Sequence, residues 1–416
     1  MVGEPGASGL RRTIATIALI ASQRPSMNAT PHIVIIGGGA VGSAVAAGLT
    51  LPARQAAFAC RVTVLERDPS YARASSALSA SSIRQQFSTA VNIAISAYGI
   101  EVLRAMPGIG LHEGGYLYLA TSAGEAVLGE NHALQCTHGV DVALLTPEQL
   151  RQRFGWLSAD GLALGSLGLS GEGWFDGYSL LQAFRAQARA QGARYMQAEA
   201  LGFDSKNNGQ RTTIQRVKLS NQEHLDADIV VNAAGPWARQ VAAWAGIDLP
   251  VAARRRTVFH VSCPKPLPTC PLLIDPSGIW LRPEGSGFLI GLAPPEGEDA
   301  DDLPLDQPDL AAFEAIVWPT LAARIPAFEA LRLQRAWAGY YEMNTFDHNA
   351  IVGLHPTCAN LVFANGFSGH GLQQAPAVGR GVAELIATGG YQTLDMSPLG
   401  WARVLHGQPL LERNVI

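Results

Sequence analysis

Residues 32–42 read His-Ile-Val-Ile-Ile-Gly-Gly-Gly-Ala-Val-Gly, a continuous apolar run of strand length that ends in glycines. Such a run is typical of a parallel strand that is buried on both faces. Small, helix-compatible residues follow at 43–47, and a second β-branched strand is predicted over Arg61–Leu65. The two strands and the helix between them predict a βαβ unit with a right-handed crossover.

The glycines of this stretch, Gly37, Gly39 and Gly42, have the G-x-G-x-x-G spacing of a dinucleotide-binding turn. The spacing permits a tight turn, close approach of the backbone to a pyrophosphate and close packing of the helix on the strand. Glu66 stands at the end of the second strand, where its carboxylate can accept hydrogen bonds from ribose hydroxyls. This context favours a dinucleotide site over a purely structural turn, and Glu66 disfavours a 2′-phosphate such as that of NADP.

A second glycine-rich stretch, Asn-Gly-Phe-Ser-Gly-His-Gly-Leu-Gln-Gln-Ala-Pro at 365–376, precedes an apolar run through Val378, Val382 and Leu385. Its glycines let the backbone approach a ligand closely. The free N–H groups at the start of the following helix suit a phosphate or an electron-rich ring. Taken alone, the stretch is also compatible with an ordinary turn.

The composition indicates a globular chain with two lobes, because 416 residues with 48% hydrophobic and 15% charged side chains can form substantial cores. A net charge of -4 and the lack of a long basic block argue against nucleic acid or an anionic membrane as partner. The five cysteines are scattered and include no Cys-x-x-Cys pair, which favours a reducing compartment such as the cytoplasm.

The first thirty residues differ from the rest. The apolar run Thr13–Ala21 follows two arginines and is too short to span a bilayer. It could be a weak targeting segment, but no convincing cleavage site follows it, and Met27 could be a second start. We therefore expect residues 1–30 to be a dispensable extension and find no integral membrane segment in the sequence.

Helix and strand signals alternate along the chain, which predicts an α/β architecture. Ser179 can cap a helix whose apolar face includes Leu180 and Phe184, with Gly192 as its end. Strands are predicted over 114–119, 228–232, 257–261, 278–282 and 287–291, and four of these, all except 228–232, have the character of an antiparallel sheet. The proline-rich stretch 264–276 and the acidic stretch 296–309 are predicted to be surface loops.

We therefore expect two interleaved domains. A nucleotide-binding domain would comprise residues 31–110, 176–248 and 336–416. A domain built on an antiparallel sheet would comprise residues 111–175 and 249–335, with the shape of the substrate pocket set by its loops.

Small-residue turns recur at 75–82 (Ser-Ser-Ala-Leu-Ser-Ala-Ser-Ser), 233–237 (Ala-Ala-Gly-Pro-Trp) and 366–371. An NAD enzyme does not need these turns. Together with the first glycine turn they resemble the D-amino-acid-oxidase and sarcosine-oxidase (DAO) superfamily of FAD-dependent oxidoreductases, from about Ile33 to about Thr388. Residues 338–349, Ala-Gly-Tyr-Tyr-Glu-Met-Asn-Thr-Phe-Asp-His-Asn, look most like the branch containing a mitochondrial FAD-oxidoreductase-domain protein linked to complex I assembly.

The resemblance implies a Rossmann-type, GR2-like FAD-binding domain interleaved with an antiparallel-sheet substrate domain. It assigns the pyrophosphate to the first glycine turn and the adenosine ribose to Glu66, and it implies that positive helix-start N–H groups stabilise the reduced flavin. The cofactor-binding residues that it implies are Gly37, Gly39, Ala40, Val41, Gly42, Glu66, Arg67, Ser75, Ser81, Ser82, Ala234, Gly235, Trp237, Gly339, Gly366, Gly369, His370, Gly371, Leu372 and Gln373.

For the substrate, the resemblance points to Arg84, which matches an arginine that holds a carboxylate in related oxidases. A surface ion pair is the alternative for Arg84. Tyr341 matches a pocket aromatic, or it is simply part of the core. His370 and Gln373 complete the residues expected at the catalytic site. Arg256 and Arg282 are weaker candidates, because an arginine on a sheet strand more often covers a solvent face.

Three positions depart from the sarcosine-oxidase pattern. Gln373 replaces a lysine that helps to bind the carboxylate, and Leu289 replaces a lysine that promotes the reaction with oxygen. Gly339 stands where those oxidases attach the flavin through a cysteine. We therefore expect non-covalent FAD, and a dehydrogenase that passes electrons to a quinone or carrier protein becomes plausible beside an oxidase that uses oxygen.

A metal site is not expected. His132, Cys136 and His138 lack a fourth ligand at convincing spacing.

The resemblance predicts an enzyme that oxidises the C–N bond of a small amine or amino acid, N-alkylated or of D configuration, by hydride transfer to the flavin. Its alternative is a flavoprotein assembly factor for a respiratory complex, in which FAD serves folding. The substitutions at Gln373 and Leu289 favour the assembly factor, whereas Arg84 and Tyr341 favour the enzyme.

Overall fold

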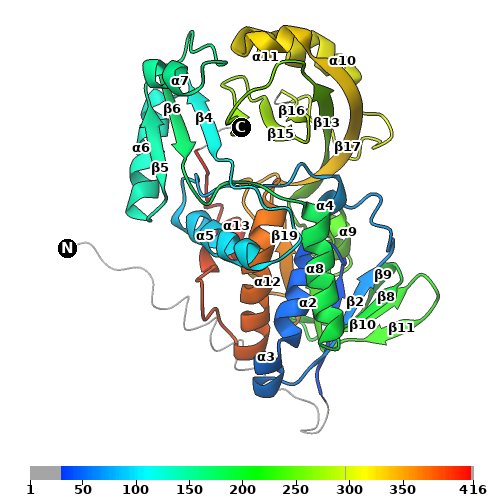
Figure 1. Cartoon of the computed structure of the whole chain (residues 1–416). Coiled ribbons are helices and arrows are strands. Elements are labelled where there is room, and N and C mark those ends of the chain that lie inside the picture. The colour runs from blue at the N-terminus through cyan, green and yellow to red at the C-terminus, as the bar shows by residue number, and fades with distance from the viewer. Residues whose placement is uncertain (1–29, 296, 414–416) are drawn as a thin grey trace.

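The computed structural model describes residues 30–295 and 297–413. The extension predicted for residues 1–30, including Thr13–Ala21 and Met27, lies outside the described residues except for Thr30. Two large sheets organise the rest of the chain, one in each lobe (Figure 1). No helix among the described residues combines the length and the apolar character needed to cross a membrane.

The first sheet has six strands in the order β18-β19-β12-β1-β2-β8 and is parallel except for the β18–β19 pair. The glycine turn follows β1, near the middle of the sheet. The strands are β1 (His32–Ile36), β2 (Arg61–Glu66), β8 (Arg194–Gln197), β12 (Ile229–Asn232), β18 (Ile351–Leu354) and β19 (Leu361–Asn365).

Side chains of β1 alternate between two cores. Ile33 and Ile35 pack with the helices α2, α8 and α12 on one face, whereas Val34 and Ile36 pack on the other face against α9, α13 and a three-stranded sheet. The helices are α2 (Ala40–Thr50), α3 (Pro52–Ala57), α5 (Ala90–Ala105), α8 (Gly177–Ala190), α9 (Ala238–Ala243), α12 (Gly371–Thr388) and α13 (Trp401–Leu405). The small sheet comprises β9 (Ala200–Asn207), β10 (Thr212–Leu219) and β11 (His224–Asp226). Burial on both faces explains why β1 is apolar from Ile33 to Ile36.

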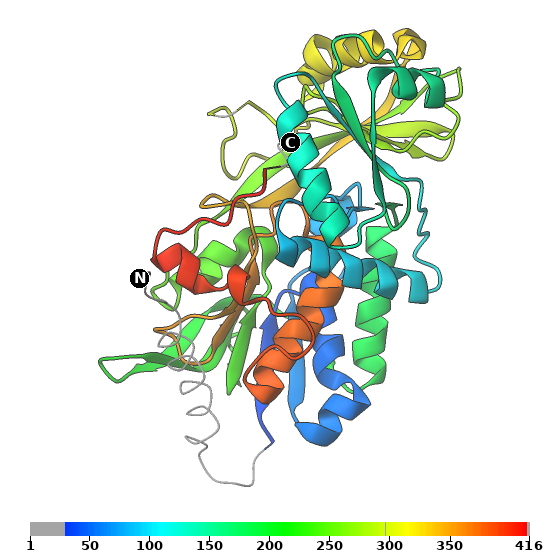
Figure 2. The same cartoon turned by 90° about the vertical axis from the view of Figure 1, so that its left-hand side faces the viewer.

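The second sheet has eight strands in the order β17-β13-β16-β15-β14-β4-β6-β5. Its pairs are antiparallel except for β14 with β4. The strands are β4 (Tyr116–Ala120), β5 (Val142–Leu145), β6 (Leu164–Gly168), β13 (Val251–Ser262), β14 (Leu272–Ile274), β15 (Trp280–Glu284), β16 (Gly287–Gly291) and β17 (Arg332–Asn344). Helices α6 (Glu125–Thr137), α7 (Pro147–Arg153), α10 (Leu310–Ala312) and α11 (Trp318–Arg324) belong to this lobe, as Figure 2 shows from the side.

Two long strands connect the lobes. β13 and β17 pair along their whole length, from Val251 with Asn344 to Ser262 with Arg332. Val251 packs in the core that contains Val34, whereas Phe259 packs in the core of the eight-stranded sheet. The ribbon therefore runs from one core into the other. The structure confirms an α/β lobe with a largely parallel sheet, joined to a lobe built on a largely antiparallel sheet.

Two local predictions are wrong. Asp176, not Ser179, caps α8, because its carboxylate accepts hydrogen bonds from the backbone N–H groups of Tyr178 and Ser179. The stretch 264–276 is not entirely a surface loop, because Leu272–Ile274 forms the buried strand β14 inside the second sheet. The acidic stretch is mostly exposed among its described residues, 297–309.

Candidate functional site

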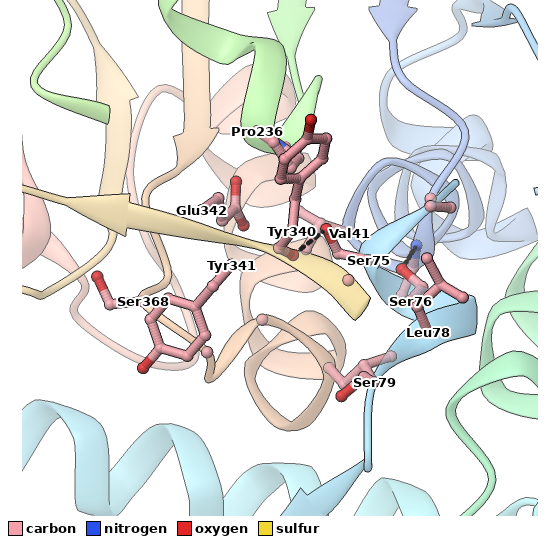
Figure 3. A pocket seen from close by; sticks show the side chains of 18 of the residues that line it. Val41, Ser75, Ser76, Leu78, Ser79, Pro236, Tyr340, Tyr341, Glu342 and Ser368 are labelled. Atoms are coloured by element: carbon pink, nitrogen blue, oxygen red, sulfur yellow. Dashed lines mark hydrogen bonds between the residues drawn. The ribbon is translucent and has the colours of Figure 1, made fainter. Parts of the chain in front are cut away.

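A cavity of about 980 Å³ is lined by both lobes. Its walls come from the glycine turn after β1, residues 65–84, the turn after β12, the strand β17 and the start of α12, and Figure 3 shows part of this lining. The short segments α4 (Ser75–Leu78), β3 (Ser82–Ile83) and β7 (Gly173–Trp174) lie in this region or beside it. A volume of this size suits an extended organic cofactor together with a small substrate.

The glycine turn is packed too closely for side chains. Gly37 has φ +102°, and a Cβ atom there would lie 2.3 Å from the carbonyl oxygen of Ala233. A Cβ on Gly42 would lie 1.9 Å from the carbonyl oxygen of Gly37. Gly39, the N-cap of α2, lines the cavity with Ala40 and Val41. Gly42 does not line it, so its contribution is close packing of the helix on the turn.

Glu66 lines the cavity and is hydrogen-bonded to the same turn. Its Oε2 accepts from the backbone N–H of Gly38 at 3.0 Å, and its Oε1 accepts from that of Asp68 at 2.9 Å. Burial raises the pKa of Glu66 above its usual range, although these N–H groups oppose the shift. The carboxylate is therefore held at the end of β2, where the sequence predicts a ribose contact.

Arg67 and Trp237 form a stacked wall next to Glu66. The Arg67 guanidinium lies 3.8 Å from the centroid of the indole ring, and both residues line the cavity. Ala234 and Gly235 line it from the turn after β12, where Gly235 has φ +54°. A flat aromatic base could lie along such a wall.

The predicted serines follow one another along the cavity. Ser75 donates its hydroxyl to the carbonyl oxygen of Tyr340 at 2.7 Å, which links α4 to β17 (Figure 3). Ser81 has φ +52°, and its backbone N–H donates to Ser79 Oγ at 3.1 Å. Ser82 opens β3, and all three predicted serines line the cavity.

The start of α12 faces the cavity through Gly371, Leu372 and Gln373. Gly369, with φ +85°, lies so close to Tyr341 that a Cβ would meet the ring at 2.2 Å. Gly366, with φ +71°, packs against Asn344 and Val251 and does not line the cavity. Gly369 and Gly371 therefore line the cavity, whereas Gly366 allows close packing of the turn.

Arg84 is 3% exposed and lines the cavity, which excludes the surface ion pair as its role. Its guanidinium lies 4.3 Å from the ring centroid of Phe87 and 5.4 Å from that of Tyr118. Its Nη2 contacts His370 Nε2 at 2.7 Å, whereas Nη1 is buried without a hydrogen-bond partner. A buried cationic donor without an acceptor is costly, so an anionic group in the cavity would stabilise it.

His370 and Gln373 hold this arginine from α12. Since arginine can only donate, His370 Nε2 must accept and the ring is neutral. Burial, together with the charge of Arg84, lowers the pKa of His370 to about 3. Gln373 Oε1 accepts from the backbone N–H of Arg84 at 2.9 Å. Four residues predicted for catalysis, Arg84, Tyr341, His370 and Gln373, thus line one cavity.

Arg256 also lines the cavity, with its guanidinium 5.0 Å from the centroid of the Tyr341 ring. It forms two hydrogen bonds of 2.7 Å with Asp299. Its charge is therefore already paired, unlike that of Arg84.

Arg282 does not cover a solvent face, contrary to the prediction. It is 5% exposed, and its Nε donates to the carbonyl oxygen of Ala80 at 2.8 Å. Leu289 pairs with it across β15 and β16, and neither residue lines the cavity. Residues directly opposite on antiparallel strands share a face, so the buried Arg282, which is paired with Glu284, is the neighbour of Leu289.

Gly339 lies against α4, where a Cβ would meet Leu78 Cβ at 3.0 Å. None of the five cysteines, all of them described residues, lines the cavity. His132 and Cys136 lie one turn apart on α6, with sulfur-to-nitrogen distances of 3.6 and 3.9 Å. Residues 30–295 and 297–413 contain no group of three His, Cys, Asp or Glu side chains able to hold a metal.

Among the residues that line this cavity and that sequence reasoning missed, Ser76 and Glu342 make notable contacts. Ser76 Oγ accepts from the backbone N–H of Ala40 at 3.1 Å, at the first turn of α2. Glu342 lines the cavity from β17, and its Oε2 is buried without a partner. The sequence does contain a signal for Glu342. It directly follows Tyr341, which was predicted to lie in the pocket, and a charged residue at such a position is unusual.

These residues fit FAD. The glycine turn carries no side chains that would block a pyrophosphate, Glu66 lies at the end of β2, where a ribose contact is predicted, and the first residues of α12 line the cavity. Orphaned polar atoms on Arg84 and Glu342 provide further contacts for a polar ligand.

Comparisons with known proteins agree with this fit. Residues 32–385 match the family model described as FAD dependent oxidoreductase (DAO). The chain is 40% identical to FAD-dependent oxidoreductase domain-containing protein 1 of Xenopus laevis, over 92% of this chain and 84% of the relative. It is 27% identical to a glycine oxidase of Geobacillus kaustophilus, over 85% and 92% of the two chains.

The structure superposes on that of L-proline dehydrogenase from P. horikoshii with a TM-score of 0.80 at 28% identity, covering 92% of this chain and 99% of that one. The architecture, the cavity and the sequence matches agree. This chain therefore belongs to the DAO family of FAD-dependent oxidoreductases, whose members include amino-acid oxidases and dehydrogenases.

Proposed function

We propose that the protein oxidises the C–N bond of an amino acid, either N-alkylated or of D configuration. The substrate loses a hydride from carbon and a proton from nitrogen, and the resulting imine hydrolyses in water. FAD supplies the two-electron acceptor when it is bound. The proposal draws support from relatives named for the oxidation of glycine and of L-proline.

The single observation that carries the proposal is the unpartnered Nη1 of Arg84. The guanidinium is buried against Phe87 and Tyr118, so its position is fixed before a ligand arrives. A substrate carboxylate could accept from Nη1 in a place from which water is largely excluded. An amino acid fits this requirement better than a simple amine.

The other residues would position the substrate. Neutral His370 orients the guanidinium by accepting from Nη2. Gln373 holds the backbone of Arg84 from the first turn of α12. Tyr341 would border the substrate, since it lines the cavity between the start of α12 and Arg256. No strong protein base is needed if the amine binds neutral, so positioning is the main task of these groups.

Non-covalent binding of FAD is part of the proposal, because no cysteine reaches the cavity. The electron acceptor would be a quinone or carrier protein rather than oxygen, on the basis of the leucine at 289. Arg282 lies on the same face of the sheet as Leu289, but its charge is paired with Glu284, so it does not take the place of a free lysine.

A flavoprotein scaffold is the competing function. A scaffold has no need for a buried arginine with an unpartnered donor, whose burial has a cost in stability. This observation favours the enzyme, and we do not propose a respiratory partner.

The test is anaerobic reduction of the bound flavin, followed by its absorbance, with a panel of N-alkyl and D-amino acids. The expected result is bleaching by at least one member of the panel. Reoxidation by oxygen and by quinone analogues would then identify the acceptor class. Failure of every amino acid, in protein that dithionite reduces normally, would eliminate the proposed activity.

A further inference from the structure

Glu342 is a titratable side chain that the proposed chemistry does not use. It lies on β17 between Tyr341 and the buried Asn344, and its side chain lines the cavity. In Figure 3 Tyr340 and Glu342 extend to one side of β17, whereas Tyr341 extends to the other. Glu342 therefore does not share the face on which Tyr341 lies.

The two carboxylate oxygens of Glu342 have different surroundings. The backbone N–H groups of Gly366 and Phe367 donate to the carboxylate. Oε2 has no hydrogen-bond partner although it is buried. No ion pair of Glu342 occurs within residues 30–295 and 297–413. Burial raises the pKa of Glu342 to about 8, more than the two N–H groups lower it. The carboxyl group is therefore incompletely satisfied by the protein.

Glycines leave space around this carboxyl group. A Cβ atom on Gly371 would lie 3.6 Å from Oε1, and one on Gly235 would lie 3.8 Å from Oε2. Gly371 is the first residue of α12, and Gly235 belongs to the turn whose Ala233 touches Gly37. Glu342 thus lies between the glycine turn of the pyrophosphate site and the helix start expected to face the flavin ring.

In FAD these two groups are joined by the ribityl chain, which carries hydroxyl groups. A hydroxyl donates most favourably to a carboxylate, and a buried carboxylate without a donor is unfavourable. We propose that Glu342 binds the cofactor by accepting a hydrogen bond from a ribityl hydroxyl of FAD. This role is independent of the substrate and of turnover.

The experiment measures the Kd of the apoprotein for FAD by quenching of flavin fluorescence. Glu342→Gln keeps one oxygen for the two backbone donors and replaces the other by a donor. At about pH 9, where a group with a pKa of about 8 is mostly ionised, the expected loss of affinity is about 10- to 100-fold, as for a hydrogen bond to a charged group. Glu223→Gln, at an exposed turn between β10 and β11, is the matched control and should leave the Kd unchanged.

FAD analogues that each lack one ribityl hydroxyl complete the test. Wild-type protein should bind one of them about 10- to 100-fold more weakly than FAD, and Glu342→Gln should bind that same analogue no more weakly than wild type does. Wild type that binds every analogue as tightly as FAD would overturn the proposal, and this result needs no variant. The proposal would also be overturned if Glu342→Gln lost the same factor of affinity for FAD and for every analogue. A residue with a purely structural role would weaken the binding of all these ligands equally.

Discussion

Replacing Arg84 tests the carboxylate site most directly. Arg84→Lys keeps the charge but loses the planar fork that reaches His370 with one nitrogen and the cavity with the other. One hydrogen bond between a substrate carboxylate and a charged group contributes about 1.5–3 kcal/mol. At about 1.4 kcal/mol per tenfold change, carboxylate ligands should bind roughly 10- to 150-fold more weakly.

The assay titrates FAD-loaded protein with small carboxylic acids and follows the perturbation of the flavin absorption spectrum. FAD content should remain near wild type, because Gln373 accepts from the backbone of residue 84 rather than from its side chain. Arg216→Lys is the control, since Arg216 is exposed and pairs with Asp226 on the small sheet. Equal carboxylate affinity in Arg84→Lys and wild type would refute the reasoning.

Three further results are expected. Gly42→Ala should yield protein without FAD, as measured by absorbance of the purified protein, because its Cβ would lie 1.9 Å from the carbonyl oxygen of Gly37; normal FAD content would contradict this. Asp347→Asn should lower the free energy of unfolding by about 3–5 kcal/mol in denaturant titrations, because it leaves the Arg403 guanidinium buried without its carboxylate; a change below about 1 kcal/mol would count against it. Burial raises the pKa of Glu172 to about 7 from 4.5, so native protein binds this proton more tightly than unfolded protein does. The contribution of Glu172 to the free energy of unfolding should therefore fall as pH rises from about 4.5 to 7. Glu172→Gln should remove that part of the pH dependence of the melting temperature, and an unchanged pH profile would refute the assignment.

Three strands of the first sheet, β1, β2 and β12, were predictable because burial on both faces favours a continuous apolar run. β1 has the predicted bounds, and β2 extends one residue further, to Glu66. β14 was not predictable, because three apolar residues between prolines have no periodicity and become a strand only through pairing with β4. Ser179 is a suitable cap by residue type, yet Asp176 accepts from the free N–H groups at the start of α8. Start positions of helices depend on local backbone geometry that residue type alone does not determine.

The sequence was sufficient to identify the turns that form the candidate site. It was less informative about the contacts that the side chains make there. The resemblance identified Arg84, but its unpartnered Nη1 depends on aromatic neighbours from β4 and on α12. Glu342 was missed because a glutamate on a strand is usually exposed. Arg282 is buried because β15 faces the chain near Ala80, a tertiary contact without a local sequence signal.

The ribbon of β13 and β17 has a mechanical consequence. Thirteen residues of β17 extend roughly 40 Å at about 3.4 Å per residue, and the ladder with β13 continues from one core into the other. Opening the lobes like a hinge would have to bend this ladder or break its hydrogen bonds. Access to the cavity would therefore depend on smaller segments beside it, such as residues 297–309, which Asp299 and Asp301 attach to Arg254 and to the cavity-lining Arg256. Motions that limit turnover are best sought in that stretch rather than between the lobes.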